Sequence, residues 1–215
     1  LYKMPANIAN QSHAKFQRIA SGVNLADANL IPAMRTEIQD LVAYLNKNSR
    51  PATEILTSNI SFAQNANLRM IYGQTSSSPA WNNVTESNAV RFPASERAGI
   101  LTRAGHLLSG SYTERLIMRG VHVRDQILCL DLGVSPPNAA TTPLPTTDNM
   151  TTREKYEVTT SGASCVGCHS QINPAGFALS EYNSLGGFQT QEPIFNANGD
   201  FVRLLPVDKN VNLLT

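Results

Sequence analysis

The stretch Cys165-Val166-Gly167-Cys168-His169 carries the most specific signal in this chain. Its spacing, C-x-x-C-H, is the attachment pattern of c-type haem. Two thiols one helical turn apart can add across the two vinyl groups of a porphyrin, and the imidazole that follows can bind the iron. We therefore predict one covalent haem c, attached to Cys165 and Cys168, with His169 as an iron ligand.

Three other interpretations explain less of this stretch. A structural zinc site needs four ligands, usually in two separated pairs, and the chain has only one further cysteine, Cys129. A thioredoxin-type C-x-x-C needs a strand before it, whereas residues 159–164 are typical of a loop. A structural disulfide would leave His169 without a role. Cys129 itself is predicted to be a small buried residue or to pair with a cysteine outside this chain.

Upstream of the motif the pattern is mostly helical. The predicted helices cover residues 32–48, 61–72 and 111–130. Ser111 and Glu114 have the spacing of a capping box at the start of the third helix, and Thr151 and Glu154 have it again just before the motif. Gly73 suits the position after the end of the second helix. Within the third helix, Gly120 indicates a close approach to a porphyrin edge or to another helix.

These elements predict a mainly α protein, a helical c-type cytochrome-like domain with long irregular linkers and a small β ribbon over 189–202. We expect a helical N-terminal region over 1–110 and a haem-binding region over 111–215, with a proline-containing linker over 133–149. The two regions should form one compact unit. Asn-Gly and Gly-Gly pairs after the motif are hairpin signals and give the ribbon its place.

Composition restricts the class of protein. The chain has 215 residues, with 17 Lys and Arg against 16 Asp and Glu, so it has no basic field for nucleic acid. No apolar run approaches the ~20 residues of a membrane span. A charged fraction of 15% beside many Asn, Ser and Thr residues favours a periplasmic or an extracellular, cell-surface location. Covalent haem is attached outside the cytoplasm, so we expect the chain to be a mature product or, by preference, a piece of a longer protein.

The residues after the motif are predicted to cover the haem. The run 173–177, Asn-Pro-Ala-Gly-Phe, is typical of a turn. Phe177 follows His169 by eight positions and would give an exposed porphyrin face apolar cover. Pro174 and Phe177 are therefore predicted cofactor contacts, and we expect the whole segment to fold over the haem edge.

The order of motifs resembles that of the planctomycete-type cytochrome c family, whose tandem domains of unknown function end in a C-x-x-C-H haem segment. That family continues with an Asp-Pro-x-Gly-Phe-Ala-Leu-Glu box and a Phe-Asp-x-x-Gly box. This chain has Asn173-Pro174-Ala175-Gly176-Phe177-Ala178-Leu179-Ser180 and then Tyr182-Asn183-Ser184-Leu185-Gly186. Weaker likenesses lie upstream, so the resemblance covers about residues 37–202. It implies a secreted haem protein in which Asn173 and Ser180 replace the two carboxylates of the first box.

A second iron ligand must come from before the motif, because no residue after His169 is His or Met. The candidates are Met4, Met34, Met70, Met118, Met150, His13, His106 and His122. We predict Met118, which sits early in the third helix, in a segment where relatives often place a side chain able to bind metal. Met150, His122 and His106 are the alternatives.

The predicted function is that of a monohaem c-type cytochrome that passes single electrons outside the cytoplasm, as part of a larger protein or complex with a redox partner. A haem enzyme, peroxidase- or oxidase-like, is one alternative; it would need an open iron position and a distal acid–base pair, for which His122 with Arg119 or Arg124 are candidates. A haem-bearing structural subunit of an electron-transfer assembly is another. We expect a carrier rather than an enzyme.

Overall fold

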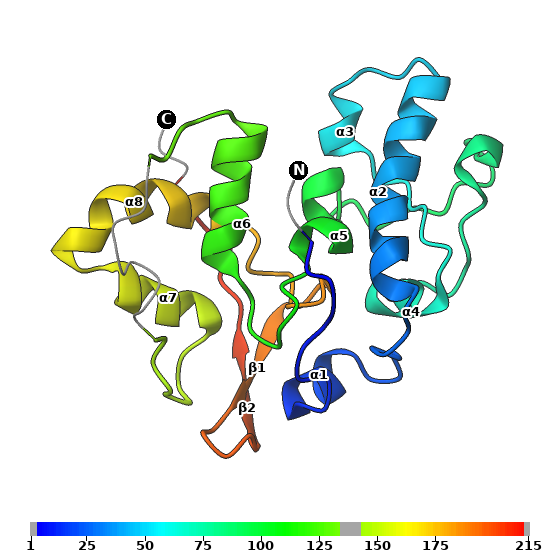
Figure 1. Cartoon of the computed structure of the whole chain (residues 1–215). Coiled ribbons are helices and arrows are strands. Elements are labelled where there is room, and N and C mark those ends of the chain that lie inside the picture. The colour runs from blue at the N-terminus through cyan, green and yellow to red at the C-terminus, as the bar shows by residue number, and fades with distance from the viewer. Residues whose placement is uncertain (1–3, 134–142, 213–215) are drawn as a thin grey trace.

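The computed structural model describes residues 4–133 and 143–212, so most of the predicted linker over 133–149 lies outside the described residues. About 40% of the chain is helical, and a two-stranded antiparallel ribbon lies near the C-terminus (Figure 1). The helices are α1 (Ala14–Ile19), α2 (Leu30–Lys47), α3 (Glu54–Thr57), α4 (Ala66–Ile71), α5 (Ala104–Leu107), α6 (Leu116–His122), α7 (Thr152–Thr160) and α8 (Ala163–Phe177). Short 3₁₀ turns η1 (Trp81–Asn83) and η2 (Ile100–Thr102), the π-helical turn η3 (Val123–Ile127) and the strands β1 (Gln191–Phe195) and β2 (Phe201–Pro206) complete the chain. A mainly α class with a C-terminal ribbon is thus confirmed, while a cytochrome-like fold stays a prediction.

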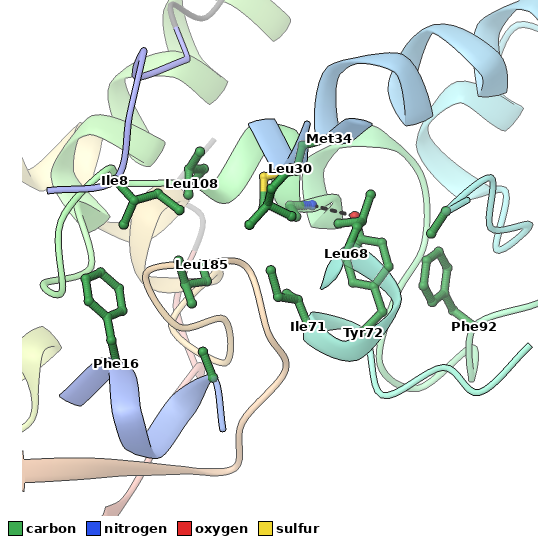
Figure 2. Close-up of a cluster of buried hydrophobic side chains, with 13 residues drawn as sticks. Ile8, Phe16, Leu30, Met34, Leu68, Ile71, Tyr72, Phe92, Leu108 and Leu185 are labelled. Carbon is green, nitrogen blue, oxygen red and sulfur yellow. Dashed lines mark hydrogen bonds between the residues drawn. The ribbon is translucent and has the colours of Figure 1, made fainter. Parts of the chain in front are cut away.

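Helix α2 is the longest of the described helices and lies close to the range predicted for it, residues 32–48. Its buried face carries Leu30, Met34 and Leu41, none of which is measurably exposed. Met34 is therefore part of the hydrophobic core and is not accessible as an iron ligand. Around it lie residues that are far apart in the sequence, among them Phe16, Leu68 and Leu185; Figure 2 shows this cluster.

Leu185, which follows the haem motif, is packed in a core otherwise made by residues 8–108. The two predicted regions, 1–110 and 111–215, therefore share apolar packing. Full burial of side chains of this size stabilises a fold by about 1.5–3 kcal/mol each. Figure 1 shows α2 to α5 on one side of the molecule and α6 to α8 on the other, with α1 and the ribbon at one end.

Three fully buried arginines hold loop backbone in place around this core. Arg119 donates to the carbonyl oxygens of Leu107, Leu179, Tyr182 and Asn183, at 2.8, 3.1, 2.7 and 2.8 Å. Arg103 pairs with buried Glu37 and also donates to the backbone of residues 58, 60 and 99. Arg97 lies over the ring of Tyr72 at 4.6 Å and donates to the backbone of residues 102 and 186. Buried carbonyls without helical partners are satisfied here by guanidinium groups.

Two predicted helix starts were wrong. The helix expected from 111 begins at Leu116, because Glu114 does not cap it: its carboxylate instead accepts a 2.8 Å hydrogen bond from buried Lys15 of α1. The helix expected over 61–72 covers only α4, since Asn65 caps the backbone N–H of Leu68. The capping box of Thr151 and Glu154 is confirmed at the start of α7.

The surroundings of the haem motif are more helical than predicted. Residues 159–164 are not a loop, because α7 ends at Thr160 and α8 begins at Ala163. The run 173–177 is not a turn but the last part of α8, which continues through Pro174. Proline costs a helix one hydrogen bond, and tight packing of this part of α8 against α6 offsets that cost. Tertiary contacts have overridden local propensity here.

The ribbon forms close to the predicted range, with Gln191 opposite Pro206 and Phe195 opposite Phe201. Gly199 sits in its turn at φ +84°, a backbone conformation that glycine adopts without strain. The ribbon packs against α1, where His13 contacts Phe195 and Arg18 lies over Phe201. It does not fold over the haem motif, which corrects the expectation of a cover from that segment.

Candidate haem site

Helix α8 places the three motif side chains on one side of itself. At 100° per residue, Cys165, Cys168 and His169 fall within an arc of about 100°. Farther along the helix, Ile172 and Gly176 lie within the same arc. One face of α8 therefore carries the thiols and the imidazole in its first half and a packing contact in its second half.

The thiols are available for reaction. Within the described residues, all three cysteines are free; Cys165 is half-buried and Cys168 is exposed. The structural-disulfide interpretation of the motif thus finds no support. Val166 between them is 49% exposed. Cys129 is also exposed, with φ at +53°, so the prediction that it is buried was wrong.

His169 is half-buried and oriented by a hydrogen bond. Its Nδ1 lies 2.9 Å from Oδ1 of Asn173, one turn along α8. The side-chain amide of Asn173 donates to Oγ1 of Thr160 at 2.9 Å, and this hydroxyl donates to the carbonyl oxygen of Tyr156 at 2.7 Å. The chain of bonds joins α8 to α7 and engages only one of the two ring nitrogens of His169.

The second half of the same face docks on α6 at a contact between two glycines. A Cβ built on Gly120 would lie 2.2 Å from the carbonyl oxygen of Ile172, and one on Gly176 would lie 2.1 Å from that of Leu116. Both positions accept only glycine, since no side-chain carbon fits at such distances. Of the two partners considered for Gly120, a porphyrin edge or a helix, the structure therefore gives it a helix.

This contact also decides where Met118 points. Leu116 and Gly120 face α8, and Met118 lies about 200° around α6 from either of them. Its side chain is 41% exposed. The structure does not bring Met118 to His169 through the α6–α8 contact. Met118 as the second iron ligand stays a prediction that the packing does not support.

The alternative ligands lie in different surroundings. His106 is buried and lies beside half-buried His122, with ring centroids 4.6 Å apart. Burial, the neighbouring His122 and Arg119 together lower the pKa of His106 to about 3. Met150 is half-buried just before α7, whose opposite end holds Asn173. None of these residues lines the cavity that contains His169.

Two cavities flank α8. One, of about 410 Å³, is lined by His169, Asn173, Pro174 and Phe177 together with residues of α7 and the C-terminal segment. The predicted contacts Pro174 and Phe177 are thus brought together with His169. Phe177 is 4% exposed, and the guanidinium of Arg153 lies 5.1 Å over its ring.

The second cavity is larger, about 870 Å³, and mostly apolar. It is lined by Ser170, Pro174 and Ala175 of α8, by Ala178 and Leu179 just after it, and by Leu128 and Leu130, which are 53% and 43% exposed. The π-helical turn η3, at the end of α6, brings these leucines beside α8; such turns are frequent at functional sites. Neither cysteine lines this cavity. It lies next to the motif and supplies apolar surface on that side of the helix.

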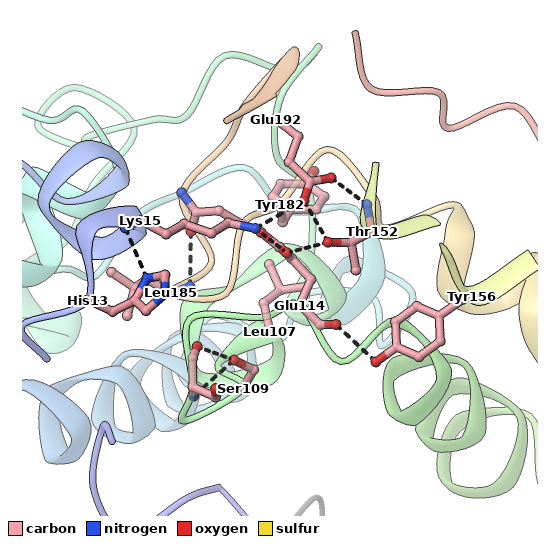
Figure 3. Close-up of polar contacts among 12 residues, drawn as sticks. His13, Lys15, Leu107, Ser109, Glu114, Thr152, Tyr156, Tyr182, Leu185 and Glu192 are labelled. Atoms are coloured by element: carbon pink, nitrogen blue, oxygen red, sulfur yellow. Dashed lines mark hydrogen bonds and ion pairs between the residues drawn. The ribbon is translucent and has the colours of Figure 1, made fainter. Parts of the chain in front are cut away.

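A buried charge cluster, which the sequence did not reveal, ties α7 to α1 and β1 (Figure 3). Lys15 of α1 binds Glu114 at 2.8 Å and Glu192 of β1 at 3.0 Å. Burial opposes the charge on Lys15, but the two carboxylates outweigh it and raise the pKa of the amine. Burial likewise opposes the charge of Glu192, yet Lys15 and Thr152 lower its pKa. Glu192 also accepts from the first backbone N–H of α7, that of Thr152, at 2.9 Å, so the cluster fixes where α7 begins.

Comparison with known proteins bears on the second half of the chain. Residues 97–192 match the PSCyt3 family model. The description of this model is a protein of unknown function (DUF1588). The model represents a domain of the planctomycete cytochrome c-type family. The matched segment is narrower than the range 37–202 of the resemblance; it begins at Arg97 and includes α6, α7, α8 and the three buried arginines. Searches of the curated proteins and of the solved structures found no match. No helix within residues 4–133 and 143–212 is both long and apolar enough to cross a membrane.

Proposed function

We propose that this chain is a monohaem c-type cytochrome that passes single electrons outside the cytoplasm, within a larger protein or complex. The observation that carries the proposal is the first half of α8, where two free thiols and an oriented imidazole share one side of an accessible helix. The PSCyt3 match over residues 97–192 includes this half of α8, and its description assigns no function.

The donor set fits a covalent porphyrin. Cys165 and Cys168 would each add S–H across one vinyl group: a C–S bond forms, the C=C π bond is lost, and the proton goes to the adjacent carbon. The step has no leaving group and needs no oxidant. His169 keeps Nε2 for the iron because Nδ1 is engaged by Asn173. When bound, the iron supplies one-electron chemistry whose potential is set by its ligands, hydrogen bonds and burial.

One observation favours a carrier over an enzyme. A peroxidase-like site would use a distal His with an Arg, and Arg119 was one candidate for that arginine. Its guanidinium is instead occupied by four backbone carbonyls in the core. Arg124 donates to Gln171 of α8 at 3.2 Å. A low-spin, six-coordinate optical spectrum supports the carrier, and a high-spin ferric spectrum supports the enzyme.

Intact mass tests the proposal. The chain, exported in a host that attaches haem c, should retain one haem after acid–acetone extraction. Cys165→Ser and Cys168→Ser should each lose one thioether, and the double variant should lose covalent haem. Cys129→Ser is the matched control, because Cys129 is an equally accessible thiol outside the motif; it should retain haem fully. A wild-type chain at bare polypeptide mass would refute the proposal.

A further inference from the structure

The hydrogen bonds that leave His169 have a direction that can be worked out from their far end. Thr160 has one hydroxyl proton, and it is donated to the carbonyl oxygen of Tyr156 at 2.7 Å. Oγ1 of Thr160 must therefore accept at its other contact, the 2.9 Å bond to Asn173. Only the NH₂ group of that amide can donate.

The orientation of the Asn173 amide follows. With its nitrogen on Thr160, its oxygen faces His169, where the two atoms are 2.9 Å apart. A carbonyl oxygen can only accept, so Nδ1 of His169 must carry the proton. In neutral imidazole the other nitrogen, Nε2, then has the free lone pair.

We infer that Asn173 is a positioning residue that holds His169 in the Nδ1–H tautomer and so directs the Nε2 lone pair toward a metal. The metal part of this inference rests on the proposed haem function; the tautomer does not. Thr160 is the anchor of the arrangement, because its single proton fixes which way the amide faces. The link also crosses from α8 to α7, so the imidazole orientation is set by the packing of two helices.

The residue type at 173 has a consequence for the potential. The partner of Nδ1 of His169 is the neutral amide of Asn173 and not a carboxylate. A carboxylate partner draws the Nδ1 proton toward itself and makes the imidazole a stronger donor, which favours ferric iron. The neutral amide does so less. Asn173 therefore sets a higher potential than an aspartate at the same position would.

The first test needs no haem. In reduced, haem-free protein, ¹⁵N NMR of the His169 ring should show the Nδ1–H tautomer. Thr160→Val removes the anchor and should mix the tautomers, while Thr160→Ser keeps the hydroxyl and should restore the wild-type spectrum. Thermal unfolding checks that each variant is folded. A wild-type ring protonated on Nε2, or a Thr160→Val spectrum identical to wild type, would overturn the inference.

The second test uses the haem-loaded chain. Asn173→Asp should lower the midpoint potential, while intact mass still reports one haem. An unchanged or raised potential overturns the role given to the amide. If no haem attaches to the wild type, the proposed function fails, and the NMR result still decides the tautomer independently.

Discussion

The two halves of helix α8 differ in how closely the rest of the protein packs against them. In the second half, Gly176 lets the backbone of α8 touch that of α6, with no room for a single added carbon. In the first half, Cys168 and Val166 are exposed, and nothing lies within 4 Å of a Cβ added at Gly167. The protein packs closely around the second half of α8, whereas the first half is accessible. The proposed haem would therefore attach where the protein leaves α8 uncovered.

The largest expected effect is in the buried region. Arg119→Met keeps much of the side-chain volume but removes four hydrogen bonds to backbone carbonyls. The carbonyls of Leu179 and Asn183 keep a backbone donor, so those of Leu107 and Tyr182 are the two left unsatisfied. Since each orphaned buried group costs about 1–3 kcal/mol, we expect a loss of about 2–6 kcal/mol in the free energy of unfolding, or failure to fold. Urea unfolding followed by circular dichroism measures it. A loss below about 1 kcal/mol would mean that the loop carbonyls are solvated.

Next comes the glycine contact. Gly176→Ala puts a carbon 2.1 Å from the carbonyl oxygen of Leu116, so α6 and α8 must separate. We expect a loss of about 2–3 kcal/mol in the free energy of unfolding. Gly120→Ala should cost a similar amount, and the double variant should cost less than the sum, because one separation relieves both clashes. Additive losses would contradict a shared contact.

Acid should weaken the buried region through His106. Its folded pKa is about 3, mainly because of burial, and its unfolded pKa is about 6.5. The unfolded chain therefore takes up a proton that the folded chain refuses as pH falls below 6.5, and stability decreases. From pH 6.5 to 4.5 the loss should reach about 2–3 kcal/mol. In His106→Gln the decrease of stability with falling pH should be smaller, and His122→Gln measures how much of it comes from the neighbouring His122. An unchanged pH dependence in His106→Gln would contradict its assignment to His106. The loss through Glu192, whose folded pKa is lowered, sets in only below pH 4.5.

The smallest effect is expected in the accessible half. Gly167→Ala meets no atom and replaces glycine inside a helix, so it should stabilise the haem-free protein by up to about 1 kcal/mol. The same substitution at Gly176 destabilises, so the sign of the change distinguishes the two halves. Destabilisation by Gly167→Ala would show that the first half is packed.

How far the sequence allowed prediction differs between these regions. The period of α2, the ribbon with Gly199 and the box of Thr151 and Glu154 depend on neighbouring residues, and all three were predicted. The start of α6 was not, because Glu114 binds Lys15, 99 positions away. The motif and the nearness of Pro174 and Phe177 to His169 could be inferred locally. The link of Asn173 to Thr160 could not, since it depends on how α7 packs against α8.

Amide hydrogen exchange along α8 tests the contrast between its halves most directly. In haem-free protein, the amides of residues 167–170 should exchange fast and those of 175–177 slowly, because only the latter lie in the contact with α6. With haem attached through Cys165 and Cys168, residues 167–170 should become protected while 175–177 change little. Equal protection of both halves without haem, or no gain on attachment, would contradict the assignment of this half of α8 as the haem site.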